Sequence, residues 1–271
     1  MAVLKILKVG CILFLISSKF PCFGQPAWPD YFNDCDVKGS ITIFDYGRQK
    51  WISSDIHDSN TPTLPASTFK IINTLIVLET GTIKSVEDIV VWPGKIDTSK
   101  YGYRPEIFKN LTLHEAFKQS AGWAYVELAK KIGKDRYRFY LDKCNYGNLD
   151  LSINDDDFWN FGSFAISPIN QIEILKGIYE ETLPFSKSHF KSLKEIMIVK
   201  QTENYVLRAK TGWSRYGGLD TGWWVGYLET KGNTYFFATR IIKDRSDYNP
   251  NFSSCRMKIT YAVFRDLGII K

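Results

Sequence analysis

A serine and a lysine stand three residues apart in the segment Leu64-Pro65-Ala66-Ser67-Thr68-Phe69-Lys70. Residues i and i+3 share one face of a helix, so Ser67 Oγ and Lys70 Nζ can come within hydrogen-bonding reach. The proline disfavours a helical residue before it, and the apolar run over residues 71–78 predicts a buried helix. Ser67 is therefore expected near a helix N-terminus, where free N–H groups favour developing negative charge.

The lysine of this pair lies in a strongly apolar stretch. Burial lowers the pKa of a lysine and yields a neutral amine, which is a base and reacts with carbon dioxide. The pair thus indicates a serine acyl-transfer enzyme whose base is not histidine. A bare S-x-x-K is common by chance, however, and the plainer interpretation is that Ser67 caps a core helix while Lys70 extends to water. None of the three histidines stands in a setting typical of a Ser-His-Asp triad (His57, His114, His189).

A second group of polar residues, Lys210-Thr211-Gly212, follows at the end of a predicted strand. The lysine and threonine offer a positive charge and a hydroxyl group for a carboxylate. The glycine is expected to let a substrate approach the strand edge closely. The tripeptide alone is weak evidence, but downstream of S-x-x-K, in a strand-rich third of the chain, it carries much more weight.

Hydrophobic patterning predicts strands at both ends of the chain and a helical middle. The predicted strands are Gly39–Asp45, Gln49–Ser53, Tyr205–Ala209, Gly222–Leu228 and Thr234–Ile242. The predicted helices are the one that carries Ser67, then Thr112–Gln119, Trp123–Ile132, Lys134–Cys144, Pro168–Glu181, Ser186–Val199 and Ser253–Leu267. This order favours an α/β protein of the α+β kind, with an antiparallel sheet, terminal helices on it, and a helical lobe over about 67–200 inserted between strands.

The first 24 residues have the layout of a secretory signal peptide. Lys5 and Lys8 precede an apolar core from Val9 to Ile16, which is too short to span a bilayer. We expect cleavage after Gly24 and secretion across the inner membrane into the periplasm. The remainder, residues 25–271, is predicted to form one domain of roughly 245 residues.

Charge and cysteine content exclude several classes of protein. Removing the signal peptide takes away three lysines and lowers the net charge from +6 to about +3, too little to indicate a nucleic-acid partner. Three cysteines remain, and without a C-x-x-C pair they indicate neither a disulfide framework nor a zinc site (Cys35, Cys144, Cys255). One disulfide is possible, but the sequence does not indicate which pair.

Together, these motifs resemble those of the serine β-lactamase and penicillin-binding superfamily, and their details point to class D, the oxacillinase type. The resemblance covers essentially the whole mature sequence. It rests on Pro65-Ala66-Ser67-Thr68-Phe69-Lys70, Tyr146-Gly147-Asn148, Phe158-Trp159 with Gly162, Asn170-Gln171, Lys210-Thr211-Gly212 and Trp223-Trp224-Val225-Gly226. The class A pattern fits poorly, because Ser120-Ala121-Gly122 stands where S-D-N is expected.

The resemblance implies a mechanism for hydrolysis of β-lactam antibiotics, and so a role in antibiotic resistance. Lys70 would be N-carboxylated, and the carbamate would act as the general base for acylation of Ser67 and for deacylation. Trp159 would donate its indole N–H to the carbamate. Its plainer role is that of a core tryptophan. Ser120 would relay a proton to the leaving β-lactam nitrogen.

The resemblance also implies the substrate contacts and the cofactors. The backbone N–H groups of Ser67 and Trp213 would hold the oxyanion. Lys210, Thr211 and Arg256 would bind the substrate carboxylate beside Gly212, although an arginine in the last helix is also a common surface residue. No metal and no cofactor is expected beyond carbon dioxide or bicarbonate for Lys70. The expected partners are β-lactam small molecules, with no nucleic acid and no stable membrane span.

One residue departs from the class D pattern. Gly122 replaces the valine of the usual S-x-V, and glycine would open the pocket, hydrate Lys70 and raise its pKa, unless Trp123 fills the space. This departure keeps an alternative open: a penicillin-binding or sensor-like protein that forms a long-lived acyl-enzyme with little turnover. A non-catalytic binding module fits less well, because the reactive residues all remain.

Overall fold

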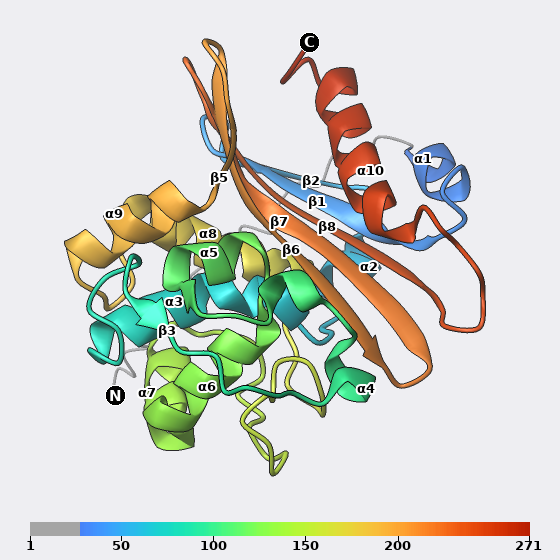
Figure 1. Cartoon of the computed structure of the whole chain (residues 1–271). Coiled ribbons are helices and arrows are strands. Elements are labelled where there is room, and N and C mark those ends of the chain that lie inside the picture. The colour runs from blue at the N-terminus through green and yellow to red at the C-terminus, as the bar shows by residue number, and fades with distance from the viewer. Residues whose placement is uncertain (1–27) are drawn as a thin grey trace, which may run out of the picture.

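The computed structural model of the protein describes residues 28–271, so the predicted signal peptide lies outside the described residues. A six-stranded antiparallel sheet of strand order β2-β1-β8-β7-β6-β5 runs through the molecule (Figure 1). Its strands are β1 (Lys38–Asp45), β2 (Lys50–Ser53), β5 (Ile198–Gln201), β6 (Tyr205–Tyr216), β7 (Leu219–Thr230) and β8 (Thr234–Asp244). The α+β fold class predicted from the sequence is confirmed.

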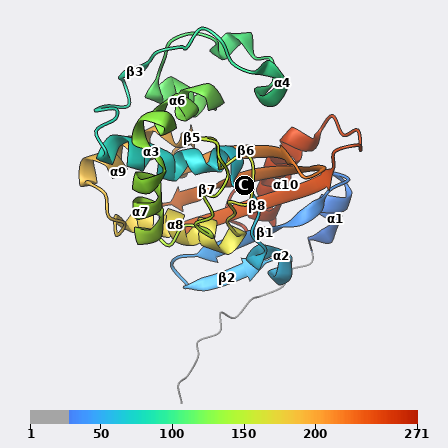
Figure 2. The ribbon, with the colours of Figure 1, turned by 90° about the horizontal axis from the view of Figure 1, so that it is seen from below.

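Helices cover both faces of this sheet. The short α1 (Pro29–Asn33) and the C-terminal α10 (Phe252–Asp266) lie on one face (Figure 1). The other face carries the helices that lie between β2 and β5 in the chain, and Figure 2 shows them from below. They are α2 (Ile56–Asn60), α3 (Lys70–Glu79), α4 (Thr98–Tyr101), α5 (Leu113–Lys118), α6 (Gly122–Ile132), α7 (Lys134–Lys143), α8 (Pro168–Glu180) and α9 (Lys187–Ile196). Two 3-10 turns, η1 (Ala66–Phe69) and η2 (Pro105–Ile107), and the two-stranded pair β3 (Ile89–Val90) and β4 (Leu111–Thr112) complete this side.

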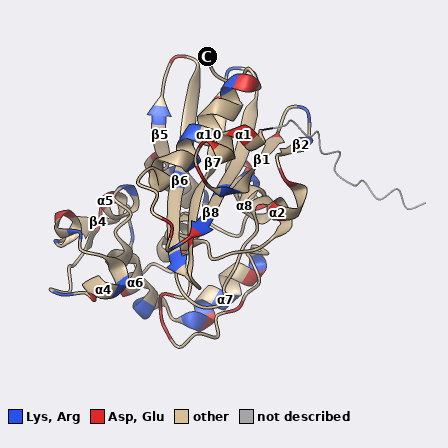
Figure 3. Cartoon of the chain, turned by 90° about the vertical axis from the view of Figure 1, so that its right-hand side faces the viewer, with Lys and Arg blue, Asp and Glu red and all other residues tan. Residues whose placement is uncertain are grey.

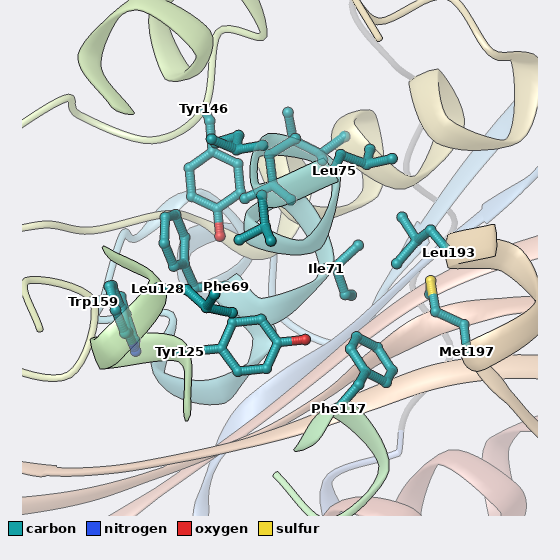
Figure 4. Close-up of a cluster of buried hydrophobic side chains, with 14 of the residues drawn as sticks. Phe69, Ile71, Leu75, Phe117, Tyr125, Leu128, Tyr146, Trp159, Leu193 and Met197 are labelled. Atoms are coloured by element: carbon teal, nitrogen blue, oxygen red, sulfur yellow. The ribbon is translucent and has the colours of Figure 1, made fainter. Parts of the chain in front are cut away.

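The larger hydrophobic core surrounds α3, whose residues from Lys70 to Leu78 are all buried. Aromatic rings from distant parts of the chain pack on its first turn, as the labelled side chains of Figure 4 show. Phe69 lies 5.1 Å from the ring of Trp159, stacked at 18°, and 5.6 Å from that of Tyr146. Each such side chain contributes on the order of 1.5–3 kcal/mol through burial, so the start of α3 is firmly held.

A disulfide links the end of α1 to α10, on the face of the sheet that these two helices share. Cys35, just after α1, is bonded to Cys255 in α10, with 6.0 Å between the Cα atoms and a separation of 220 residues. Asn249 adds a hydrogen bond from Nδ2 to the carbonyl oxygen of Cys35, at 2.7 Å. The remaining described cysteine, Cys144, is buried and free.

The structure corrects two boundaries expected from the sequence. Lys210-Thr211-Gly212 was predicted at the end of a strand, but β6 continues to Tyr216 and places the tripeptide in its middle. The helix predicted over Ser186–Val199 ends at Ile196, and its last predicted residues belong to β5.

The charges of the described chain are mixed on its surface. Figure 3 shows Lys and Arg interspersed with Asp and Glu, without a continuous stripe of one sign on that face. Over residues 28–271, no helix combines the length and apolarity that a membrane span requires.

Candidate active site

The serine and the lysine of the S-x-x-K motif meet at the junction of η1 and α3. Lys70 Nζ donates a hydrogen bond to Ser67 Oγ at 3.0 Å. The backbone around the serine is tied to its surroundings, because the N–H of Ala66 donates to the carbonyl oxygen of Trp159 at 2.9 Å. Ala66 also has a positive φ of 50°, a conformation that costs an L-residue energy and is enriched at functional sites.

Lys70 is fully buried, with no exposed side-chain surface. Burial lowers its pKa to about 8, while the carboxyl group of Asp157 acts in the opposite direction. Nζ lies 5.1 Å from the centre of the Tyr125 ring. At pH 7 roughly a tenth of the lysine is then the neutral amine, far more than for an exposed lysine.

Trp159 sits beside this lysine helix with an unsatisfied indole N–H. Its ring is completely buried and stacks on Phe69, as Figure 4 shows. Nε1 has no hydrogen-bond partner among residues 28–271. A buried donor without a partner is costly, and it fits an acceptor group delivered to this position.

A second lysine and serine meet on the opposite wall. Lys210 in β6 donates from Nζ to Ser120 Oγ at 3.1 Å. Ser120 has a positive φ of 55° in the turn between α5 and α6. Burial, together with the nearby charges of Lys70 and Arg256, lowers the pKa of Lys210 well below its usual value.

Gly212 allows β6 to lie directly against η1. A Cβ at this position would stand 2.9 Å from the carbonyl oxygen of Pro65 and 3.0 Å from Cγ2 of Thr68. The sequence suggested that this glycine makes room for a substrate at the strand edge. In the structure, the atoms that approach it belong to the turn that carries Ser67, so the glycine sets the spacing of the two walls.

Arg256 reaches the same place from α10. It is buried at 6% exposure rather than lying on the surface. One guanidinium nitrogen donates to the carbonyl oxygen of Gly212 at 2.5 Å, and Nε has no partner in the described part of the chain. Burial lowers the pKa of Arg256 to about 10, which still leaves a cation at neutral pH. Next to Gly212, the indole of Trp213 donates to Asp220 at 3.1 Å.

A cavity of about 910 Å³ connects these groups. Its lining includes Ser67, Ser120, Gly122, Thr211, Gly212, Trp213 and Arg256. Lys70, Trp159 and Lys210 do not line it and are buried beneath its surface. Aromatic rings from Tyr101, Tyr103, Phe108 and Phe161 form part of the wall.

The expected effect of Gly122 on the lysine is absent from the structure. Gly122 begins α6 and faces the cavity, and no described atom beyond its chain neighbours lies within 4 Å of the Cβ that another residue would have. Lys70 nevertheless remains unexposed, with a lowered pKa, because the aromatic rings and α3 cover it. Trp123 donates its indole N–H to the carbonyl oxygen of Ile107 at 2.8 Å and packs on Trp92 at 4.9 Å.

Asp157 is a residue near the site that sequence reasoning did not identify. It precedes Phe158-Trp159 and is fully buried, and burial raises its pKa to about 7. The phenol of Tyr101 approaches this carboxyl group. Three consecutive aspartates suggest a solvated loop. The only sequence signal for the burial of Asp157 is its position next to Phe158-Trp159, a pair of large aromatic residues.

Comparisons with known proteins agree with this geometry. Residues 44–264 match the model of the penicillin-binding protein transpeptidase domain. The β-lactamase OXA-20 of Pseudomonas aeruginosa is 38% identical over 216 residues, which cover 79% of this chain and 78% of that protein. The regulatory protein BlaR1 of Bacillus licheniformis is 34% identical over 212 residues, which cover 78% of this chain and 34% of BlaR1.

Solved structures are similar over nearly the whole chain. A class D β-lactamase from Sebaldella termitidis is 40% identical, with a TM-score of 0.86, covering 92% of this chain and 98% of that one. The chain therefore belongs to the penicillin-binding protein transpeptidase domain family. Within this family, it is a class D serine β-lactamase.

Proposed function

We propose that this protein hydrolyses β-lactam antibiotics through an acyl-enzyme on Ser67, with N-carboxylated Lys70 as the general base for both half-reactions. The similarity to class D β-lactamases supports β-lactam hydrolysis in general. The carboxylated base is supported by one observation above others. A buried lysine of lowered pKa touches the serine, and Trp159, whose ring stacks on the residue before that lysine, has a buried indole N–H without a partner among the described residues.

Carbon dioxide fits the chemistry of these residues. Once bound to the amine of Lys70, it would supply a carboxylate that accepts the Ser67 proton and gives it up toward the leaving nitrogen. In deacylation the same carboxylate would accept a proton from water and return it to Ser67. Trp159 would hold that carboxylate through its free N–H, and the surrounding rings exclude bulk water. No metal enters this scheme.

The residues on both walls support attack on the β-lactam carbonyl. We propose that the N–H groups of Ser67 and Trp213 hold the oxyanion, because β6 lies against η1 at Gly212. Loss of one such donor typically costs ~3–4 kcal/mol in transition-state stabilisation. Ser120, hydrogen-bonded to Lys210, would pass a proton to the leaving nitrogen.

The substrate carboxylate would bind at the Arg256 end of the cavity. The guanidinium group lines the cavity with its Nε unsatisfied, and Thr211 adds a hydroxyl group at the same surface. Lys210 lies beneath this surface, so we propose that it contributes positive potential and proton transfer through Ser120.

The alternative is a penicillin-binding or sensor-like protein that stays acylated. The similarity to BlaR1 favours it. In either case, we propose that residues 1–24 direct secretion across the inner membrane into the periplasm, with cleavage after Gly24.

Carbon-13 NMR with labelled bicarbonate tests the carboxylated base. We expect a carbamate resonance in the wild-type protein that is absent from Lys70→Ala. A folded wild-type protein without this resonance would contradict the proposed base, and a persistent acyl-enzyme in the same sample would then favour the alternative.

A further inference from the structure

The charged residues that line the active-site cavity are all basic. No Asp or Glu belongs to the lining within the described residues, and the basic residues come from α4, α5, β6, α10 and two loops (Lys100, Arg104, Lys118, Arg215, Arg245, Arg256). A cavity lined by charges of one sign attracts ligands of the opposite sign. The steps proposed above use only Arg256, for the carboxylate on the β-lactam nucleus. The cavity therefore offers more positive charge than a monoanionic substrate needs.

Most of the remaining basic residues are either occupied or unsupported. Lys100 pairs with Asp155 at 2.5 Å, and Arg215 lies 3.8 Å from an aspartate in β7. Lys118 donates to a backbone carbonyl oxygen at the start of β5. The side chain of Arg245 is exposed in the loop after β8. An exposed arginine loses much side-chain entropy when it is fixed on an anion.

Arg104 differs from these residues because its guanidinium group is fixed with one nitrogen left over. Nη2 donates to the carbonyl oxygen of Gln119, the residue before Ser120, at 2.9 Å. Nε donates to Glu106 Oε1 at 2.9 Å. Nη1 makes no hydrogen bond within residues 28–271. The group is thus pre-organised for an anion, and less side-chain freedom is lost when it binds one.

Arg104 also lies close to the groups that react with the substrate. Its charge lowers the pKa of both Lys70 and Lys210. Lys210 donates to Ser120, which directly follows the carbonyl group that holds Arg104. Arg104 therefore belongs to the same part of the cavity as the residues proposed to carry out acylation.

Aromatic rings flank Arg104 in the sequence and in the cavity wall. Tyr103 and Phe108 line the cavity, with their ring centres 5.8 Å apart in edge-to-face contact. Phe108 stacks on Trp92 at 5.1 Å, whereas Tyr103 is exposed. A ring surface beside a fixed guanidinium group suits an aromatic group that carries an anion next to its ring.

We propose that Arg104 binds a second carboxylate, on the side chain of the substrate, and so favours dianionic β-lactams. The substrate class is penicillins whose side chain bears an aryl group and an adjacent carboxylate. The aryl group packs on Tyr103 and Phe108, and the side-chain carboxylate accepts a hydrogen bond from Arg104 Nη1. The inference rests on the proposed function, because it concerns the β-lactam that acylates Ser67.

The carboxylate on the β-lactam nucleus is a poorer partner for Arg104. Arg104 and Arg256 are hydrogen-bonded to different elements, the first to Gln119 after α5 and the second to Gly212 in β6. Arg256 keeps its Nε without a partner among the described residues, and Thr211 adds a hydroxyl group there. The nucleus carboxylate is thus served at the Arg256 end, and Arg104 is left for a different anionic group.

The test compares two penicillins that differ by one carboxylate, one with a phenylacetyl and one with an α-carboxyphenylacetyl side chain. Second-order rate constants for acylation of Ser67 are measured by rapid-quench mass spectrometry near neutral pH, where both carboxylates are ionised. In Arg104→Gln, the ratio of the two constants, dianion over monoanion, should fall by about fivefold relative to wild type. Arg136→Gln is the matched control. It removes the same charge from an exposed position of α7 outside the cavity lining, and it should leave the ratio unchanged.

Two further variants cover the case in which the loss of Arg104 disturbs its loop. Glu106→Gln removes the exposed carboxylate that competes for the guanidinium group, so the ratio should rise by roughly twofold. Arg104→Lys keeps the charge but loses the fork of donors. Its ratio should lie between those of wild type and Arg104→Gln.

The outcomes separate this inference from the proposed function. Because only acylation is measured, the comparison applies equally to a hydrolase and to a long-lived acyl-enzyme. Equal losses for both penicillins in Arg104→Gln would assign Arg104 to the carboxylate that they share and overturn the inference. A ratio unchanged in Arg104→Gln and in Glu106→Gln would overturn it as well. A wild-type protein that neither penicillin acylates would contradict the proposed function itself.

Discussion

Two buried lysines, each hydrogen-bonded to a serine of the cavity wall, differ in the charged groups around them. Lys70 donates to Ser67 at 3.0 Å, and Lys210 donates to Ser120 at 3.1 Å. Lys70 has a carboxyl group, Asp157, and the free N–H of Trp159 on its side. Lys210 has further cations around it, which lower its pKa along with burial. The free indole N–H thus suits the Lys70 side to receive an anionic group, whereas burial and the nearby cations suit Lys210 to pass on a weakly held proton.

The largest effect that separates the two lysines is expected from their alanine variants. Lys70→Ala removes the base of both half-reactions, so turnover of a β-lactam should fall by ~1,000-fold or more and deacylation should be abolished. Lys210→Ala should slow acylation by ~100-fold but leave deacylation intact. Mass spectrometry should therefore detect a persistent adduct in the first variant and none in the second. Full turnover by Lys70→Ala would contradict the account.

A smaller loss of stability and acylation rate is expected when the spacing between β6 and η1 is changed. In Gly212→Ala, the added Cβ would meet the turn that carries Ser67, and the resulting shift should destabilise the protein by about 1–3 kcal/mol. Gly232→Ala is the control, because no described atom lies within 4 Å of its Cβ position. Thermal denaturation and acylation rates measure both effects. If the two variants behave alike, close contact between β6 and η1 is not needed.

Loss of the Trp159 N–H should affect the carboxylation of Lys70 and not the function of Lys210. Trp159→Phe keeps a ring against Phe69 but removes the donor, so the bicarbonate concentration for half-maximal activity should rise roughly tenfold. Trp123→Phe is the control, since its N–H binds Ile107 instead. Equal bicarbonate dependence in Trp159→Phe and wild type would mean that the indole does not hold the carboxylated lysine.

The smallest effect is expected at Gly122. A valine there would project into open space, so Gly122→Val should change the free energy of unfolding by no more than ~0.5 kcal/mol. Because Lys70 is already unexposed, the bicarbonate requirement should fall by less than about twofold. A large fall would show that water reaches Lys70 through Gly122 after all.

Local sequence patterns predicted most of the fold. The helix over Thr112–Gln119, for example, has a capping box between Thr112 and Glu115, and it appears as α5. The strands with Lys210 and Trp223 were predicted too short. Their continuation to Tyr216 and from Leu219 depends on the twelve residue pairs between β6 and β7, and local propensity does not contain this pairing.

The candidate site was predictable where it consists of motifs and not where it depends on burial. Ser67, Lys70 and Lys210 stand in recognisable patterns, and the structure places Ser67 on the wall of one cavity with both lysines buried beneath it. Asp157 differs from its two acidic neighbours only by being buried, which no spacing reveals. The pairing of Cys35 with Cys255 likewise spans 220 residues, so it follows from the packing of α1 near α10 rather than from any local pattern.

The most direct test of the account mixes the purified mature protein with a chromogenic cephalosporin, with and without bicarbonate, and follows turnover together with the mass of the acyl-enzyme. We predict sustained turnover that bicarbonate increases, with no lasting adduct on Ser67. A persistent adduct with little turnover at any bicarbonate concentration would contradict a carboxylated Lys70 as the deacylating base.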